Sequence, residues 1–330
     1  MNRASKKKNF TPWIINLELT NACNLECIFC DHKDLKRKMR IQAISNGLLN
    51  KVLREARKLA GKGKIYELGL VGLGEPLLDP KLKEHIRAIA RFADIFKRIS
   101  LNSNLVTMSP EQAEMLAHSK INSYTFSVNA DNKHSYRELT GRDSFDKVIT
   151  NLNLLLHKLK QSDNRPKIDI QILDSKNGNI ERLKEKVNLP KGLNMNFFSR
   201  KVYSKPAVAN NSGLLKIHRP KNTPRYPCWD IYTRVYIDSS GNLYLCTIGN
   251  DSYRENSRLC LGNIKNNSIL SLFNSRRARE ARTVSERGLI PFPECNQCNI
   301  WSLTPNNFSW SKKFNKWAVN KKQVRAYGLK

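Results

Sequence analysis

Apolar residues in the first two hundred positions follow two alternating patterns. Short apolar runs with a strand-like composition occur at Trp13–Leu19, Ile65–Val71, Arg98–Leu101, Ser123–Val128, Ile168–Leu173 and Leu193–Phe198. Between these runs, apolar residues recur every three or four positions, which is typical of amphipathic helices. Strands that alternate with helices in this way favour a mostly parallel sheet. The pattern therefore predicts an α/β fold, a barrel-like sheet built from about six βα units.

Several helix boundaries can be predicted from capping residues. Asp79 followed by Pro80 predicts a helix that begins there and continues to about Phe92. Ser109 and Gln112 form the pattern of a capping box at the start of another helix. Periodic leucines predict further helices over Phe145–Leu159 and Ile180–Val187.

The pattern changes after the sixth strand. Residues Thr233–Leu245 alternate between apolar and polar and contain a Ser-Gly-Asn turn, which predicts a β-hairpin. One helix is expected over Ile269–Arg282. We therefore expect a partial (β/α)6 TIM-like barrel followed by a small domain made of a β-hairpin and a helix.

Composition narrows the class of protein. The 330 residues are 40% apolar, and no stretch approaches the roughly 20 apolar residues of a membrane-spanning helix. The basic N-terminus is followed by no apolar signal-peptide core, so we expect a cytoplasmic, reducing location. The 58 Lys and Arg outnumber 28 Asp and Glu, a net charge of +30. Such a surplus suggests contact with anionic partners, unless lysine is simply the solvated residue that this chain prefers.

Three of the eight cysteines lie close together as Cys23-x3-Cys27-x2-Cys30. In a reducing compartment, metal ligation is favoured over disulfide formation. Three thiolates in one loop cannot close a four-ligand zinc site. They can hold three irons of a [4Fe–4S] cluster and leave the fourth iron open for chemistry.

This cysteine loop resembles the cluster motif of the radical S-adenosylmethionine (radical SAM) superfamily. Phe29, just before the third cysteine, matches the aromatic residue that lies near the SAM adenine in that family. The loop also follows the first predicted strand, as it does in the family. The resemblance implies the partial barrel already expected from the periodicity.

The ends of three predicted strands resemble the SAM-binding segments of the same family. Gly72-Leu73-Gly74-Glu75-Pro76 is similar to the glycine-rich motif that grips the SAM methionine, although Leu73 replaces one glycine. The turns at the ends of the next two predicted strands resemble segments that make further contacts with SAM in that family. The resemblance implies a SAM site formed by Phe29, Gly74, Glu75, Pro76, Asn104, Ser127 and Asn129. From the fifth predicted strand, either Gln171 or Asp174 is expected to add a contact with SAM.

A second cysteine group consists of Cys228, Cys246, Cys295 and Cys298. Their spacing alone allows zinc or a second [4Fe–4S] cluster. The group resembles the auxiliary-cluster part of SPASM or twitch domains, which implies a second cluster. No cysteine follows Cys298, so we expect one auxiliary cluster, closed by four ligands and suited to electron transfer. Cys260 is expected to be buried and inert, the alternative being a hydrogen-atom donor or another cluster ligand.

The resemblance implies an enzyme that uses SAM and two [4Fe–4S] clusters. An electron donor such as flavodoxin or ferredoxin, with its reductase, would reduce the first cluster. SAM cleavage would then yield a 5′-deoxyadenosyl radical that abstracts hydrogen from substrate. Dehydrogenation of a sugar or related small molecule is favoured, with the auxiliary cluster as electron acceptor. A ribosomal-peptide maturase is the main alternative. A basic nucleic-acid-binding protein with a structural metal site is possible but not favoured, because it would not explain the open three-cysteine site.

Part of the positive charge is localised. Nine Lys and Arg but no acid lie between residues 186 and 229, and seven but no acid follow Cys295. We therefore expect an anionic substrate, such as a nucleotide-linked sugar or an acidic peptide, and place Lys201, Lys205 and Arg219 at its entrance. The expected organisation is a basic segment 1–12, the radical SAM barrel 13–200, a basic connector 201–227, the auxiliary-cluster domain 228–301 and a basic tail 302–330.

Overall fold

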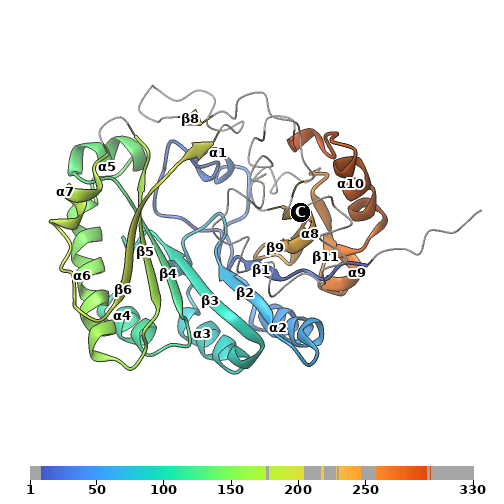
Figure 1. The fold of residues 1–330 in the computed structure, drawn as a ribbon, viewed down its shortest axis with the longest axis horizontal. Helices are drawn as coiled ribbons and strands as arrows, with labels where there is room; N and C mark the ends of the chain where they lie inside the picture. The colour runs from blue at the N-terminus through green and yellow to red at the C-terminus, as the bar shows by residue number, and fades with distance from the viewer. Residues whose placement is uncertain are drawn as a thin grey trace, which may run out of the picture.

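The computed structural model describes residues 9–175, 178–203, 217–218, 228, 230–246, 257–295 and 298. One nine-stranded sheet runs through most of this part of the chain, in the order β11-β10-β9-β1-β2-β3-β4-β5-β6. In Figure 1 the barrel strands fan out on one side of β1 and the later strands lie on its other side. The strand that carries the first cysteine loop therefore occupies the middle of the sheet.

The first six strands are parallel, as the alternation of strands and helices predicts. They are β1 (Ile14–Leu17), β2 (Ile65–Leu70), β3 (Phe96–Ser103), β4 (Ser123–Asn129), β5 (Lys167–Leu173) and β6 (Asn194–Arg200). The connecting helices are α1 (His32–Leu35), α2 (Asn46–Ala60), α3 (Leu82–Ala90), α4 (Pro110–Ala117), α5 (Lys133–Thr140), α6 (Phe145–Gln161) and α7 (Ile180–Lys184), with 3₁₀ turns η1 (Pro76–Leu78) and η2 (Ala93–Ile95). The expected partial α/β barrel is thus confirmed.

Helix capping explains where the barrel helices begin. Ser109 accepts a hydrogen bond from the backbone N–H of Gln112, and the Gln112 side chain bonds back to Ser109, so the predicted capping box is confirmed. The prediction that a helix opens at Asp79 is wrong, because α3 begins at Leu82. Asp79 instead ends the preceding 3₁₀ turn and uses its carboxylate to bind the Lys81 backbone N–H and the buried His85 ring.

The second half of the chain extends the barrel sheet. Strands β9 (Arg234–Ile237) and β10 (Asn242–Tyr244) form the predicted hairpin, and β11 (Cys260–Asn263) pairs with β10. β9 lies parallel to β1, with Ile14 opposite Arg234 and Leu17 opposite Ile237. The auxiliary segment is therefore joined to the barrel by backbone hydrogen bonds, which the sequence pattern did not predict.

The expected helix over Ile269–Arg282 is two helices, α9 (Ile269–Phe273) and α10 (Arg276–Glu286). Asn274 interrupts it, because its side chain accepts a hydrogen bond from the Phe10 N–H and donates to the Phe10 carbonyl group. Ser275 then caps α10. The remaining short elements are α8 (Asp230–Thr233), η5 (Pro293–Cys295) and the paired strands β7 (Val202–Tyr203) and β8 (Ile217–His218).

Apolar side chains from the sheet and its helices form one core. Among the largest fully buried side chains are Tyr124, Tyr136, Phe126, Phe273 and Ile15. The core includes residues from both the barrel strands and the hairpin, which follows from the shared sheet. In the described residues, every helix is too short or too polar to cross a membrane.

Candidate active site

The first cysteine loop leaves the C-terminal end of β1. Leu25 and Phe29 anchor it in the core, with 3% and 8% of their surface exposed. The backbone N–H groups of Glu26 and Ile28 donate to the carbonyl groups of Thr140 and Leu139 at the end of α5. These bonds hold the loop in one shape, with Cys23, Cys27 and Cys30 only partly buried.

The three thiols lie close enough to affect one another's ionisation. Burial raises the pKa of Cys27, and negative charge on Cys30 and Cys23 raises it further. Burial likewise raises the pKa of Cys23 to about 12. Thiols in this setting remain protonated unless a cation compensates their charge, and metal binding supplies that charge.

Three partly buried thiols lie close together in one loop. A [4Fe–4S] cluster takes one thiolate on each of several irons, so three neighbouring thiols fit a three-cysteine cluster site. In the described residues, no group of three or more His, Cys, Asp or Glu side chains is spaced to hold a single metal ion.

The Gly72–Pro76 loop, at the end of β2, packs directly on the cysteine loop. The Glu75 N–H donates to the Ala22 carbonyl oxygen at 2.7 Å. A Cβ atom at Gly74 would lie 2.2 Å from the Thr20 carbonyl oxygen, so only glycine allows this approach. The two loops that the sequence assigns to the cluster and to SAM are thus in backbone contact.

The Glu75 side chain is 3% exposed and joins three segments. Its Oε1 accepts hydrogen bonds from the Leu77 N–H and the Ser103 hydroxyl group, and its Oε2 accepts one from the Asn104 N–H at 2.7 Å. Burial raises the pKa of Glu75 to about 7, although the three donors oppose this shift. Both carboxylate oxygens are therefore engaged with the protein.

The other predicted SAM residues lie at neighbouring strand ends. The Asn104 amide donates to Asn24 Oδ1 in the cysteine loop at 2.8 Å. Gln171 Nε2 on β5 donates to Asn129 Oδ1 at 3.1 Å and lies 3.5 Å from the Ser127 hydroxyl oxygen. The backbone of Asn129 lies in the left-handed region, with a φ of 67°. The chain therefore departs from regular strand geometry at the end of β4.

Arg200, which the sequence reasoning missed, also reaches this site. Its guanidinium carbon lies 5.9 Å from the centre of the Phe29 ring. Its positive charge acts on Cys27 in the direction that lowers the thiol pKa. The only sequence signal is its position at the end of the sixth strand, where barrel enzymes place functional residues. Lys201 follows it and is exposed, whereas Lys205 and Arg219 lie outside the described residues.

The second cysteine group is assembled from distant segments. Burial raises the pKa of Cys228, and the charges of Asp230, Cys246 and Cys298 raise it further, so these groups are neighbours. The Cys228 N–H donates to the Ser285 hydroxyl oxygen on α10 at 3.0 Å, and the Cys298 N–H donates to the Cys295 carbonyl oxygen at 3.3 Å. Partly buried thiols that lie this close together again fit a bound metal group.

Cys260 is set apart from this group. The side chains that influence its ionisation are Asp238 and Arg277, and burial raises its pKa. It is only partly buried, so the expectation of a buried cysteine is wrong, while its inertness stays a prediction. Its carbonyl group accepts a hydrogen bond from Arg277, which ties the start of β11 to α10.

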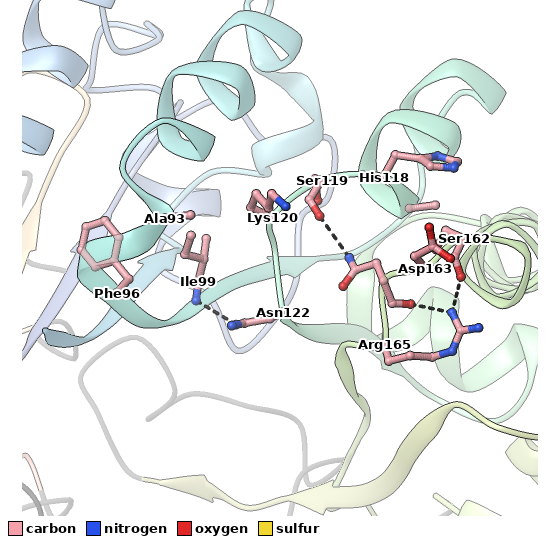
Figure 2. A pocket seen from close by; sticks show the side chains of 12 residues that line it. Ala93, Phe96, Ile99, His118, Ser119, Lys120, Asn122, Ser162, Asp163 and Arg165 are labelled. Carbon is pink, nitrogen blue, oxygen red and sulfur yellow. Dashed lines mark hydrogen bonds between the residues drawn. The ribbon is translucent and has the colours of Figure 1, made fainter.

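A cavity of about 530 Å³ lies at the opposite end of the barrel strands (Figure 2). It is lined by residues before β3 and β4 and after α4 and α6. Two of its polar side chains already bond within the protein: Asn122 accepts from the Ile99 N–H, and Arg165 donates to the carbonyl groups of Ser162 and Asn164. Because the cavity lies at the N-terminal ends of the barrel strands and the cysteine loop follows the C-terminal end of β1, the two are at opposite ends of the sheet.

Family models match both halves of the chain. That of the radical SAM superfamily matches residues 17–187, and that of SPASM, an iron-sulfur cluster-binding domain, matches residues 228–299. A probable GTP 3′,8-cyclase of Saccharolobus solfataricus is 31% identical over 137 residues, which are 41% of this chain and 41% of that protein. The chain spans about half the length of the curated relatives it matches, or less.

Two solved structures show the same fold at low sequence identity. BtrN in complex with AdoMet and 2-DOIA has a TM-score of 0.56 and 15% identity, covering 89% of this chain and 94% of that one. The anSMEcpe enzyme with bound AdoMet and Cp18Cys peptide has a TM-score of 0.53 and 16% identity, covering 87% of each chain. The two matched domains together imply SAM and two [4Fe–4S] clusters, as the sequence predicts, and the SPASM match favours iron over zinc at the second group.

Proposed function

This chain belongs to the radical SAM superfamily, and we propose that Cys23, Cys27 and Cys30 hold the SAM-binding [4Fe–4S] cluster. The observation that carries the proposal is the backbone contact between the cysteine loop and the Gly72–Pro76 loop. That contact supports a SAM site formed jointly by the cysteine loop and the glycine-rich loop at the end of β2. When bound and reduced, the cluster supplies the electron that cleaves SAM to methionine and a 5′-deoxyadenosyl radical, which removes hydrogen from substrate.

The residues around the loop have distinct tasks in this proposal. Because both Glu75 oxygens already accept hydrogen bonds, Glu75 fixes the loop, and the loop's backbone carbonyl groups meet the SAM amine. Phe29 forms an apolar wall beside the adenine. Ser127 and Asn129, held by Gln171, present hydrogen-bonding groups to the ribose or carboxylate of SAM. Burial of these groups excludes water from the radical.

Cys228, Cys246, Cys295 and Cys298 would bind the auxiliary cluster. Four protein ligands leave no iron open, so this cluster would transfer electrons rather than bind substrate. It would accept the electron of the substrate radical, which makes the net reaction a two-electron oxidation. A small, acidic redox protein such as flavodoxin or ferredoxin would reduce the first cluster.

We favour an anionic small molecule, such as a sugar derivative, as substrate. The acid-free basic stretch 186–229 contains the last barrel strand, β6, and exposed Lys201 follows Arg200 at the strand's C-terminal end. The fold shared with BtrN, whose structure contains AdoMet and 2-DOIA, supports a small-molecule substrate and says nothing of its charge. The fold shared with anSMEcpe, whose complex contains a peptide, keeps peptide modification as the second candidate.

The enzyme proposal is tested by anaerobic reconstitution with iron and sulfide, followed by SAM and dithionite. The wild-type protein should form 5′-deoxyadenosine, and Cys27→Ala should form none above background. Cys260→Ala is the matched control, because that thiol lies outside both groups, and it should retain formation. Absence of 5′-deoxyadenosine from the wild type, or equal formation by Cys27→Ala, would contradict the proposal.

The substrate class is tested separately with deuterated candidates. A sugar phosphate, a nucleotide-linked sugar and an acidic peptide are each offered, and deuterium in 5′-deoxyadenosine identifies the molecule from which hydrogen was taken. Replacing Lys201, Lys205 and Arg219 with Glu should reduce the transfer of deuterium to 5′-deoxyadenosine. The rate of SAM cleavage measured without substrate should stay unchanged. Equal transfer by the reversed protein would show that the positive charge is not part of the entrance.

A further inference from the structure

Glu18 is a buried carboxylate at the end of β1 that the proposed mechanism does not use. It is 1% exposed. Its Oε2 accepts hydrogen bonds from the Leu73 N–H at 2.9 Å and the Tyr236 hydroxyl group at 2.6 Å. Its Oε1 accepts from the Ser239 hydroxyl group at 2.9 Å and the Ser239 N–H at 3.3 Å. All four of these donors are neutral groups.

The donors come from two separate parts of the molecule. Leu73 belongs to the Gly72–Pro76 loop at the end of β2. Tyr236 and Ser239 belong to the β9–β10 hairpin, within the segment that matches the SPASM domain. Glu18 is therefore bound simultaneously by the proposed SAM loop and by the hairpin of the auxiliary-cluster domain.

The loop also packs on the aliphatic part of Glu18. A Cβ atom at Gly72 would lie 2.6 Å from both Cβ and Cγ of Glu18. Two positions later, Gly74 lies against the Thr20 carbonyl group, and the Glu75 N–H bonds to Ala22. The start of the loop is thus fixed by Glu18, and its end is fixed by the cysteine loop.

The hairpin side of this link is rigid. Asp238 accepts hydrogen bonds from the backbone N–H groups of Ser240 and Asn242, both at 2.9 Å, and from the Tyr244 hydroxyl group at 3.0 Å. These bonds set the turn that presents Ser239 to Glu18. A buried carboxylate whose hydrogen-bond donors in the described residues are all neutral is stable only when those bonds are satisfied, so both sides of the link are needed.

We propose that Glu18 is a positioning residue through which the auxiliary-cluster hairpin fixes the SAM-binding loop. The inference rests on the proposed function for the identity of that loop. Loss of a hairpin hydrogen bond to Glu18 shifts the loop and weakens SAM binding, although Tyr236 and Ser239 belong to the hairpin and not to that loop. SAM affinity in one half of the molecule therefore depends on the hairpin of the other.

The test compares Tyr236→Phe and Glu18→Gln with Tyr232→Phe in the full, reconstituted protein. Tyr236→Phe removes one hydroxyl group from the link. Tyr232→Phe is the matched control, since its hydroxyl group bonds the Arg282 carbonyl oxygen and Glu286 in the same half of the molecule, away from Glu18. The readouts are iron and sulfide content, the equilibrium dissociation constant of SAM, and the two steady-state constants KM and kcat for SAM cleavage.

Tyr236→Phe should raise the SAM dissociation constant and KM by roughly three- to tenfold, the effect of one hydrogen bond, with iron content and kcat retained. Glu18→Gln should raise them at least as much, and Tyr232→Phe should leave them unchanged. Wild-type SAM affinity in both link variants, an equal rise in the control, or cluster loss specific to Tyr236→Phe would overturn the inference. SAM binding without cleavage in the wild type would instead contradict the proposed function, while the dissociation constants would still decide the role of Glu18.

Discussion

Cys23, Cys27 and Cys30 lie within eight residues of one loop, whereas Cys228 and Cys298 are 70 positions apart. The first group follows one strand of the barrel and is held by bonds to α5 and to the Gly72–Pro76 loop. The second group is completed only when the hairpin, α10 and η5 pack together. A local site can stay accessible on one side, which suits substrate binding, while a site closed by distant segments suits electron transfer.

The largest expected effect separates the two groups by substitution. Cys27→Ala should remove 5′-deoxyadenosine formation, a loss of at least about 100-fold, because the reacting iron is no longer held. Cys246→Ala should remove about half of the bound iron and leave SAM cleavage within roughly threefold of wild type, because it empties only the auxiliary site. Iron analysis and product quantification check both.

The two groups would not differ in this way if Cys246→Ala kept its first cluster and still lost as much SAM cleavage as Cys27→Ala. That result would mean that the auxiliary group takes part in the cleavage step.

The contact between the two loops can be tested at Gly74. A methyl group there would collide with the Thr20 carbonyl group, so Gly74→Ala should lower the free energy of unfolding by about 1–3 kcal/mol. It should also weaken SAM binding. Gly47→Ala is the control, since nothing lies within 4 Å of a Cβ at that position in α2. Chemical denaturation of the cluster-free proteins measures the difference, and an equal effect at Gly47 would contradict the contact.

Glu75 gives the barrel half a specific pH dependence. Because its pKa is about 7 in the folded protein and 4.5 in the reference state, the folded protein holds a proton that the unfolded chain has lost between these values. The contribution of Glu75 to stability should therefore fall as pH rises from about 4.5 to 7. The stability difference between wild type and Glu75→Gln, measured by denaturation across this range, should change with pH. A constant difference would show that the pKa of Glu75 is not raised.

The smallest expected effect concerns Arg200, which lies beside the first cysteine group. Removing its positive charge with Arg200→Gln should make the first cluster harder to reduce and lower its midpoint potential. Lys201→Gln, at the adjacent exposed position, should leave the potential unchanged. A redox titration followed by EPR measures the midpoint potential in both variants. Equal potentials for wild type and Arg200→Gln would show that the Arg200 charge does not affect the first cluster.

The difference between the two regions also explains what could be predicted from sequence. The first cysteine loop is contiguous, so its chemistry is visible in eight residues. Glu18 could not be recognised, because Tyr236 and Ser239 are more than 200 positions away in the chain. The break between α9 and α10 has the same cause, since Asn274 is held by Phe10, 264 positions earlier. Periodicity predicts the strands and helices but not which of them meet.

Arg200 and the parallel pairing of β9 with β1 were missed for a related reason. A charged residue at a strand end has no distinctive pattern, and a hairpin sequence does not specify the strand that it joins. The SAM-site residues were named through a family resemblance, and their contacts with SAM remain predictions.

We expect the first cysteine group, and not the second, to bind SAM. The EPR spectrum of the reduced, fully reconstituted protein, recorded with and without SAM, decides between the two groups. We predict signals from two clusters, of which one changes on SAM addition, and this SAM-sensitive signal should be absent from Cys27→Ala and present in Cys246→Ala. A SAM-sensitive signal that survives in Cys27→Ala, or a wild-type spectrum unchanged by SAM, would contradict the account.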